Sequence, residues 1–119
     1  MSQGSTTNVP LYQAKADFFR TLGHPARIRI LELLCERDHA VHELLEQIGV
    51  EASNLSQQLA VLRRTSLVVS RREGGEVVYS ISYPEVRDLL LAARTILSGM
   101  LAARAELSSE LALEEAAQR

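Results

Sequence analysis

Cysteine, tryptophan and aromatic side chains are scarce in this chain. Of its 119 residues, one is a cysteine, none is a tryptophan and 4% are aromatic. The single cysteine, Cys35, cannot form an intrachain disulfide, which suits a reducing compartment. So few aromatic residues favour aliphatic packing between helices over a β-sandwich. We therefore predict one mainly helical domain, of a size at which a second subunit often adds stability.

Long apolar runs are also absent. No segment approaches the roughly 20 apolar residues that a membrane-spanning helix requires. Residues 1–8 are polar and lack the basic-then-apolar pattern of a secretory signal. We therefore predict a cytoplasmic protein with no membrane partner.

Motifs of catalysis are missing as well. The chain has no nucleophile elbow, no phosphate-binding glycine loop and no HExxH pattern. Its Gly74-Gly75 pair lies between two strand patterns rather than before a helix, and we interpret it as a turn. The sequence therefore predicts a protein that is not an enzyme.

The net charge of −2 hides an uneven distribution of charged residues. Residues 52–72 contain four arginines and no acidic residue, whereas residues 106–119 contain four glutamates and one arginine. Phosphate groups respond to the local charge more than to the total charge of the chain. The basic middle segment is therefore the candidate surface for nucleic acid.

The spacing of apolar residues predicts five helices and one hairpin. Residues 1–10 are polar and contain Gly4 and Pro10, so we predict a disordered arm there. Helices are expected at 11–22, from Pro25 to about 37, at 41–48, from about 52 to 65 and from Pro84 to about 107, and strands at 67–72 and 76–82. Residues 108–119 are acidic and are expected to fray.

Residues 41–82 are the most informative stretch. A short helix, a turn at Gly49-Val50 and a second helix are followed by two β patterns around Gly74-Gly75. This order predicts a winged helix-turn-helix, with an antiparallel hairpin as the wing. A hairpin is marginal alone, so we expect side chains of the wing to rest on the helices, chosen from Val69, Val77, Tyr79 and Ile81.

The second helix of this stretch has two different sides. Leu55, Leu59 and Leu62 fall on one side at helical spacing and must face a core. The opposite side carries Ser53, Gln57, Ala60 and Arg64. Hydrogen-bonding, small and cationic side chains together suit the base edges and phosphates of duplex DNA.

The last predicted helix has an apolar repeat that needs a partner. Its apolar residues recur at alternating steps of four and three, at Val86, Leu90, Ala93, Leu97, Met100, Leu107 and Leu111, with Arg104 as the one polar member. A repeat of 3.5 residues over about 25 residues requires another helix to cover it. We therefore predict a homodimer.

Three segments resemble the ArsR type of winged helix-turn-helix repressor. Residues 18–31, FFRTLGHPARIRIL, are similar to the second-helix signature of that family. Residues 56–63, SQQLAVLR, are similar to its recognition helix, and residues 71–79, RREGGEVVY, to its wing. The match extends from about Leu11 to Leu107, and three segments in the family's order make it highly specific.

The resemblance implies a fold, two partners and two sets of contact residues. The fold is mainly α with a small β-hairpin, in the order α-α-α-α-β-β-α, within a DNA-binding and dimerisation domain at 11–107. The partners are a second copy of the chain, through the first and last helices, and an inverted repeat in double-stranded DNA. The implied DNA contacts are Ser53, Asn54, Ser56, Gln57, Gln58, Arg63, Arg64, Arg71, Arg72, Gly74 and Gly75. The implied dimer contacts are Leu11, Phe18, Val86, Leu90, Ala93, Leu97, Met100 and Leu107.

The implied DNA contacts divide into two roles. Gln57 is the best candidate for base readout, because its amide can pair with adenine through two hydrogen bonds. The four arginines would hold phosphates, or reach the minor groove from the wing, and would set affinity more than sequence preference.

An alternative is a metal- or redox-responsive repressor. Many members of the resembled family bind metal through cysteines on the third helix or a His/Asp set on the last one. The third helix here has no cysteine and the last has no histidine, so we predict no metal and no other cofactor, and the sequence identifies no inducer. Cys35, His39, His42 and Glu43 remain a loose cluster of metal-ligand types. His24 is interpreted as a helix-start contact.

An alternative of another class is a protein-interaction module that does not bind DNA. Such a module requires an apolar outward side on the fourth helix. The polar side of residues 53–64 argues against it.

Overall fold

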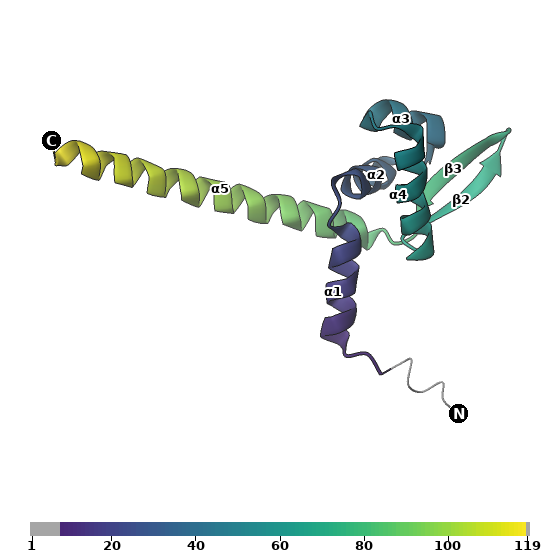
Figure 1. Ribbon diagram of the computed structural model, residues 1–119, viewed down its shortest axis with the longest axis horizontal. Coiled ribbons are helices and arrows are strands. Elements are labelled where there is room, and N and C mark those ends of the chain that lie inside the picture. The colour runs from purple at the N-terminus through teal and green to yellow at the C-terminus, as the bar shows by residue number, and fades with distance from the viewer. Residues whose placement is uncertain (1–7, 119) are drawn as a thin grey trace. The chain divides into compact units, whose positions relative to one another are not determined.

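The computed structural model describes residues 8–118. The elements are α1 (Leu11–Leu22), α2 (Pro25–Glu36), β1 (His39–Ala40), α3 (Val41–Ile48), α4 (Ala52–Arg64), β2 (Val68–Glu73), β3 (Glu76–Ile81) and α5 (Glu85–Ala117) (Figure 1). Helices predominate and the sheet is small, which confirms the predicted fold class. Two compact units divide the chain, one ending at Pro84 and the other beginning at Glu85. Most of the predicted N-terminal arm lies outside the described residues.

Three consecutive residues form the junction between α1 and α2. Gly23 ends α1, and its backbone N–H donates to the carbonyl oxygen of Arg20 at 3.1 Å. His24 caps α2, because its Nδ1 accepts a hydrogen bond from the backbone N–H of Ala26 at 3.2 Å. Pro25 takes the first helical position, where no N–H is needed. The predicted helix-start contact of His24 is confirmed.

The core of the first unit is built around α2. This helix packs against α1, α3, α4 and β3. The fully buried side chains are Ile30, Leu31, Leu34, Leu44, Leu55, Leu62 and Val68. Because two of them belong to α4, the leucine side of that helix is fixed inward and its polar side is left outward.

The wing belongs to a three-stranded antiparallel sheet in the order β1-β3-β2. The sequence predicted only β2 and β3, because the two residues of β1 are too few to show an alternating pattern. Gly74 and Gly75 have φ angles of 58° and 84°, which confirms the predicted tight turn. Of the wing residues expected to rest on the helices, Tyr79 is buried, whereas Val69 is 55% exposed.

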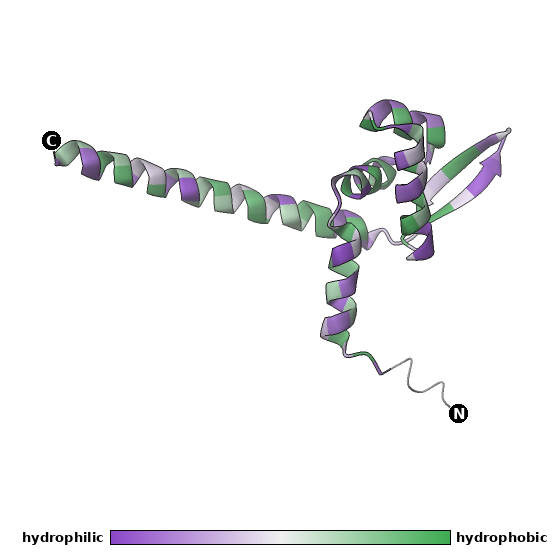
Figure 2. Cartoon of the chain, viewed as in Figure 1, coloured by the Kyte–Doolittle hydropathy of each residue, from purple (hydrophilic) through white to green (hydrophobic). Residues whose placement is uncertain are grey.

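The second unit is a single helix, α5, of 33 residues, about 50 Å long at 1.5 Å per residue. It continues to Ala117, through the stretch that was predicted to fray, where alanines and glutamates are strong helix formers. Apolar and polar residues alternate along α5 in Figure 2. Its exposed large apolar side chains are Leu91, Ile96, Leu97, Met100, Leu101, Leu107, Leu111 and Leu113. Across residues 8–118, no helix combines the length and apolarity that crossing a bilayer demands.

Candidate nucleic-acid interface

The candidate interface is centred on α4, which follows α3 after a turn and packs against α2 and β2. Gly49 ends α3 in the left-handed conformation, with φ of 76°, and the chain turns there into α4. Leu55, Leu59 and Leu62 of α4 are at most 2% exposed. The prediction that these three leucines face a core is therefore confirmed. The arrangement of α3, turn and α4 is that of a helix-turn-helix, in which the second helix enters the major groove.

The outward side of α4 carries most of the side chains predicted to contact DNA. Ser53, Ser56, Gln57, Arg63 and Arg64 are exposed, and Ala60 is half-buried. The polar character of this side does not offer the apolar surface that a protein-interaction module requires. Hydroxyl and amide groups lie near the beginning of the helix and cations at its end. The two arginines also lie in the last turn of α4, where positive charge is stabilised by the helix dipole.

Arg63, Arg64 and Arg72 are available to an external anion. Among the described residues, no carboxylate forms an ion pair with any of the three. Ala60, Arg63 and Arg64 line a shared open hollow on the C-terminal half of α4. Gly74 and Gly75, at the tip of the wing, are exposed and have no heavy atom within 4 Å of an added Cβ position. The wing tip therefore leaves room for a close approach of another molecule.

Gln58, which was predicted to contact DNA, is not part of the outward surface of α4. Its side chain is 7% exposed, and its Oε1 accepts a hydrogen bond from Nε of Arg27 at 2.8 Å. Its Nε2 donates to Oδ1 of Asn54 at 2.9 Å. A signal for this burial was present in the sequence, because position 58 lies three residues after Leu55 and four before Leu62, on the inward side. Gln58 is therefore a structural contact between α2 and α4.

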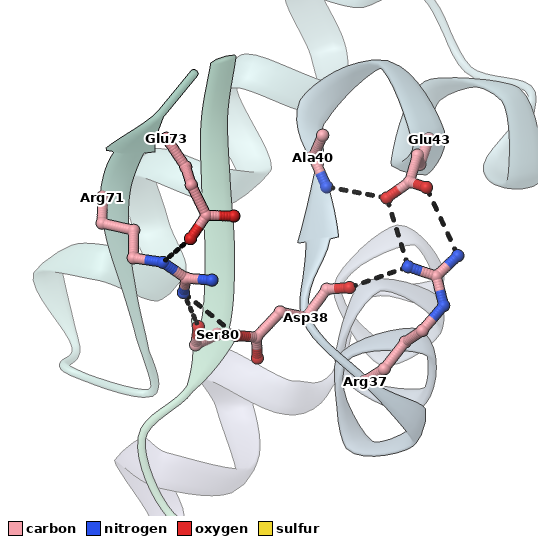
Figure 3. Close-up of polar contacts among 7 residues, drawn as sticks. All are labelled: Arg37, Asp38, Ala40, Glu43, Arg71, Glu73 and Ser80. Atoms are coloured by element: carbon pink, nitrogen blue, oxygen red, sulfur yellow. Dashed lines mark hydrogen bonds and ion pairs between the residues drawn. The ribbon is translucent and has the colours of Figure 1, made fainter. Parts of the chain in front are cut away.

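The side chain of Arg71, which was predicted to hold phosphate, forms ion pairs within the protein. Its guanidinium forms ion pairs with Asp38 at 3.0 Å and Glu73 at 3.1 Å, and donates to Oγ of Ser80 at 2.8 Å (Figure 3). Hydrogen bonds to Glu73 and then Asp38 raise the pKa of Arg71 above its usual value. Two carboxylates offset its charge, whereas Arg72, the other wing arginine, has no carboxylate partner within residues 8–118. Successive residues of a strand point to opposite faces, which separates Arg71 from its neighbour.

A second polar contact in Figure 3 joins α2 to α3. Oε1 of Glu43 accepts a hydrogen bond from the backbone N–H of Ala40 at 2.9 Å and so closes the first turn of α3. Both carboxylate oxygens of Glu43 also accept from Arg37, each at 3.3 Å. The Ala40 hydrogen bond, with help from Arg37, lowers the pKa of Glu43 to about 2.

The stability of the fold should depend on the charge of Glu43 at acid pH. Because the folded pKa of about 2 lies below the ordinary value of 4.5, the contribution is complete above pH 4.5 and is lost as the pH falls towards 2. The urea midpoint of the wild type should exceed that of Glu43→Gln at pH 7, and the difference should disappear towards pH 2. A constant difference at all pH values would contradict this assignment. Glu46→Gln is the control, since Glu46 is exposed on α3 and forms no ion pair in the described part of the chain.

The loose cluster of possible metal ligands does not converge in the structure. His39 is buried, and its Nδ1 lies 3.5 Å from Oε1 of Glu43. His42 is exposed and pairs instead with Glu76 of β3, at 3.2 Å. No group of three or more His, Cys, Asp or Glu side chains within residues 8–118 is placed to hold a metal ion. The cluster containing Cys35 therefore does not form a common site.

The side chains predicted to lie in the dimer interface are mostly exposed in the single chain. Leu11 is 70% exposed, Leu97 56% and Met100 53%. Phe18, Leu90 and the remaining members vary from half-buried to exposed, except Val86, which is buried in the isolated chain. Their role stays a prediction, since exposed apolar area alone does not identify what covers it.

A helix-turn-helix with a polar outer side and an adjoining hairpin defines the class of winged DNA-binding regulators. A family model described as "Bacterial regulatory protein, arsR family" matches residues 24–70, from the cap of α2 into β2. The chain belongs to this family. It is therefore a DNA-binding transcriptional regulator, and the recognised resemblance is confirmed.

The chain is similar over most of its length to known members. The HTH-type transcriptional regulator Rv0081 of Mycobacterium tuberculosis is 54% identical over 103 residues, which cover 86% of this chain and 90% of the relative. Its crystal structure has a TM-score of 0.74 at 56% identity and covers 82% of this chain and 98% of that chain. The biofilm growth-associated repressor of Xylella fastidiosa is 37% identical over 81 residues, 68% of this chain and 71% of the relative. The homodimeric winged helix-turn-helix domain of Mb0332 from Mycobacterium bovis has a TM-score of 0.67 at 26% identity, with coverage of 85% and 91%.

Proposed function

We propose that this regulator is a homodimeric repressor that binds a short inverted repeat and blocks transcription by occupying it. The observation that carries the proposal is the outward side of α4, where polar side chains lie beside two arginines that no carboxylate of the described residues pairs with. The protein acts in the cytoplasm by occupancy and not by catalysis. Two relatives support the proposal by name: that of X. fastidiosa is a repressor and that of M. bovis is homodimeric.

The apolar side chains that the single chain leaves exposed support the proposed dimer. On α1 these include Leu11, and on α5 they include Leu97 and Met100. A second copy of the chain would cover both surfaces under a two-fold axis. Two recognition helices would then meet successive major grooves about 34 Å apart, which is one turn of the DNA duplex.

Selection from genomic DNA tests this proposal directly. Fragments of the source genome that the purified protein retains at physiological salt are sequenced and searched for a shared motif. We expect an enriched inverted repeat whose half-sites are separated by one helical turn, roughly 10 base pairs. Retention of fragments without any shared motif would count against sequence-specific repression.

The arginines and Gln57 should have separable effects on binding. Arg64→Ala should weaken binding to every sequence and reduce the slope of log affinity against log salt by about 1 per subunit, because one phosphate contact is lost. Gln57→Ala should relax the preference at one base pair of each half-site while leaving the salt slope nearly unchanged. The measurement is affinity across a salt series for the operator and its single-base variants.

Arg71→Ala is the matched control for this pair. Because Arg71 is already paired with Asp38 and Glu73, its loss should leave the salt slope unchanged. Equal slopes for the wild type and Arg64→Ala would contradict the orientation proposed for α4.

A further inference from the structure

A chain of polar contacts begins at Arg27 and ends on the recognition helix. Arg27, in the first turn of α2, donates from Nη1 to the carbonyl oxygen of Thr21 at 3.0 Å and from Nε to Oε1 of Gln58 at 2.8 Å. Gln58 then donates from Nε2 to Oδ1 of Asn54 at 2.9 Å. The chain thus connects the end of α1, the start of α2 and the first turns of α4.

Arg27 fixes the direction of every hydrogen bond in this chain of contacts. A guanidinium has only donors, so it must meet the oxygen of the Gln58 amide and not its nitrogen. The side-chain nitrogen of Gln58 then faces Asn54. Because this nitrogen can only donate, the side-chain oxygen of Asn54 must accept the hydrogen bond. Both side-chain oxygens are thereby satisfied inside the protein. Within the described residues, the Nδ2 amino group of Asn54 has no acceptor, so it is the free end of this chain of contacts, and it can only donate.

Asn54 is placed where such a donor can meet DNA. It is the third residue of α4 and is half-buried. It lines an open hollow together with His24, Arg29 and Val50. Residues near the amino end of the second helix of a helix-turn-helix are those that contact base edges, and the nearby backbone holds phosphates.

We propose that Asn54 donates a hydrogen bond from Nδ2 to an acceptor on the DNA, and that Arg27 and Gln58 are positioning residues that impose this polarity. The acceptor is either a base-edge atom, such as a purine N7, or a phosphate oxygen. The inference rests on the DNA binding proposed above and adds a defined donor at a defined position. Without the hydrogen bonds from Arg27 through Gln58, the side-chain amide of Asn54 could rotate by half a turn and point its oxygen outward instead.

Gln58→Glu reverses the polarity at the centre of the chain. A carboxylate at position 58 still accepts from Arg27, so the contact between α2 and α4 is retained. It cannot donate, however, so Asn54 must turn its amino group inward and present Oδ1 outward. Asn54→Ala removes the outward group altogether, and the double variant shows whether the effect of Gln58→Glu passes through Asn54.

The experiment measures the affinity of the four proteins for a selected operator and for every single-base variant of it, at one salt concentration. Asn54→Ala should weaken operator binding by about 3- to 10-fold per half-site, the range for one hydrogen bond. If the acceptor is a base, the loss should be confined to sequences that carry that base, and Gln58→Glu should change the preference at the same position. If the acceptor is a phosphate, both variants should weaken binding to all sequences alike.

The variant with both Gln58→Glu and Asn54→Ala shows whether Gln58→Glu acts by positioning Asn54 or by changing the structure or the charge. Gln58→Glu should have little further effect once Asn54 is alanine. Gln47→Glu, on the exposed side of α3, adds the same charge outside the chain of contacts and controls for it. Thermal unfolding of each variant checks that the fold is retained.

Two results would overturn the inference. One is a Gln58→Glu protein whose affinities match those of the wild type at every operator position. The other is an effect of Gln58→Glu that is just as large without Asn54. Wild-type protein that binds no selected sequence would instead overturn the proposed function, so the two failures are distinguishable.

Discussion

Replacing Leu97 by aspartate is expected to convert the protein to monomers and to lower its operator affinity by roughly 100-fold or more. Leu97 is 56% exposed in the single chain and lies on the apolar repeat of α5. A carboxylate buried against the same repeat of a second copy would be desolvated without a partner, at a cost of several kcal/mol per subunit. Two half-sites engaged by one dimer gain a large effective concentration, and separated subunits lose it.

Sedimentation velocity and a gel shift on the same samples measure both parts of this prediction. Thr95→Asp is the matched control, because Thr95 is an exposed residue of α5 two positions earlier and outside the repeat. It should leave the dimer and its affinity unchanged. If the Leu97→Asp protein sedimented as a dimer, the repeat on α5 could not be the interface.

Leu62→Ala should lower the free energy of unfolding by about 2–5 kcal/mol, the range for removing a buried leucine side chain. Leu62 is 0% exposed and belongs to the cluster that fixes α4 on the core. A small domain has about 5–15 kcal/mol of stability in total, so the loss is a large fraction. Urea unfolding at a single protein concentration measures it, because the stability of a dimer depends on concentration.

Val61→Ala, at the adjacent half-buried position, provides the comparison for Leu62→Ala. It should cost clearly less, since part of that side chain already contacts solvent. Equal losses for the two variants would mean that the leucine side of α4 does not anchor the helix.

Local signals in the sequence predicted most of the fold. The helix boundaries follow from residues whose preferences do not depend on distant contacts. Gly23 and Gly49 end helices, and His24 with Pro25 begins one, each through its own backbone requirement. Every predicted helix start and end up to residue 84 therefore agrees with the structure to within a residue or two.

The details that sequence analysis missed depend on partners that are distant in the chain. Gln58 was assigned to the DNA surface through the family resemblance, but its partner Arg27 lies 31 residues earlier. Arg71 was assigned to phosphate, but Asp38, 33 residues earlier, pairs with it. A strand pattern shows that Arg71 and Arg72 must point to opposite faces, and only the tertiary structure shows which face is already occupied.

The pairing of Arg71 with Asp38 has a consequence for the conformational entropy that is lost when DNA binds. Asp38 precedes β1, so the ion pair fastens β2 to the segment that leads directly into α3. The wing is therefore held in place relative to α3 before any DNA binds. Less conformational freedom is then lost when DNA binds, so we expect Arg71 to contribute to DNA affinity through its ion pair with Asp38.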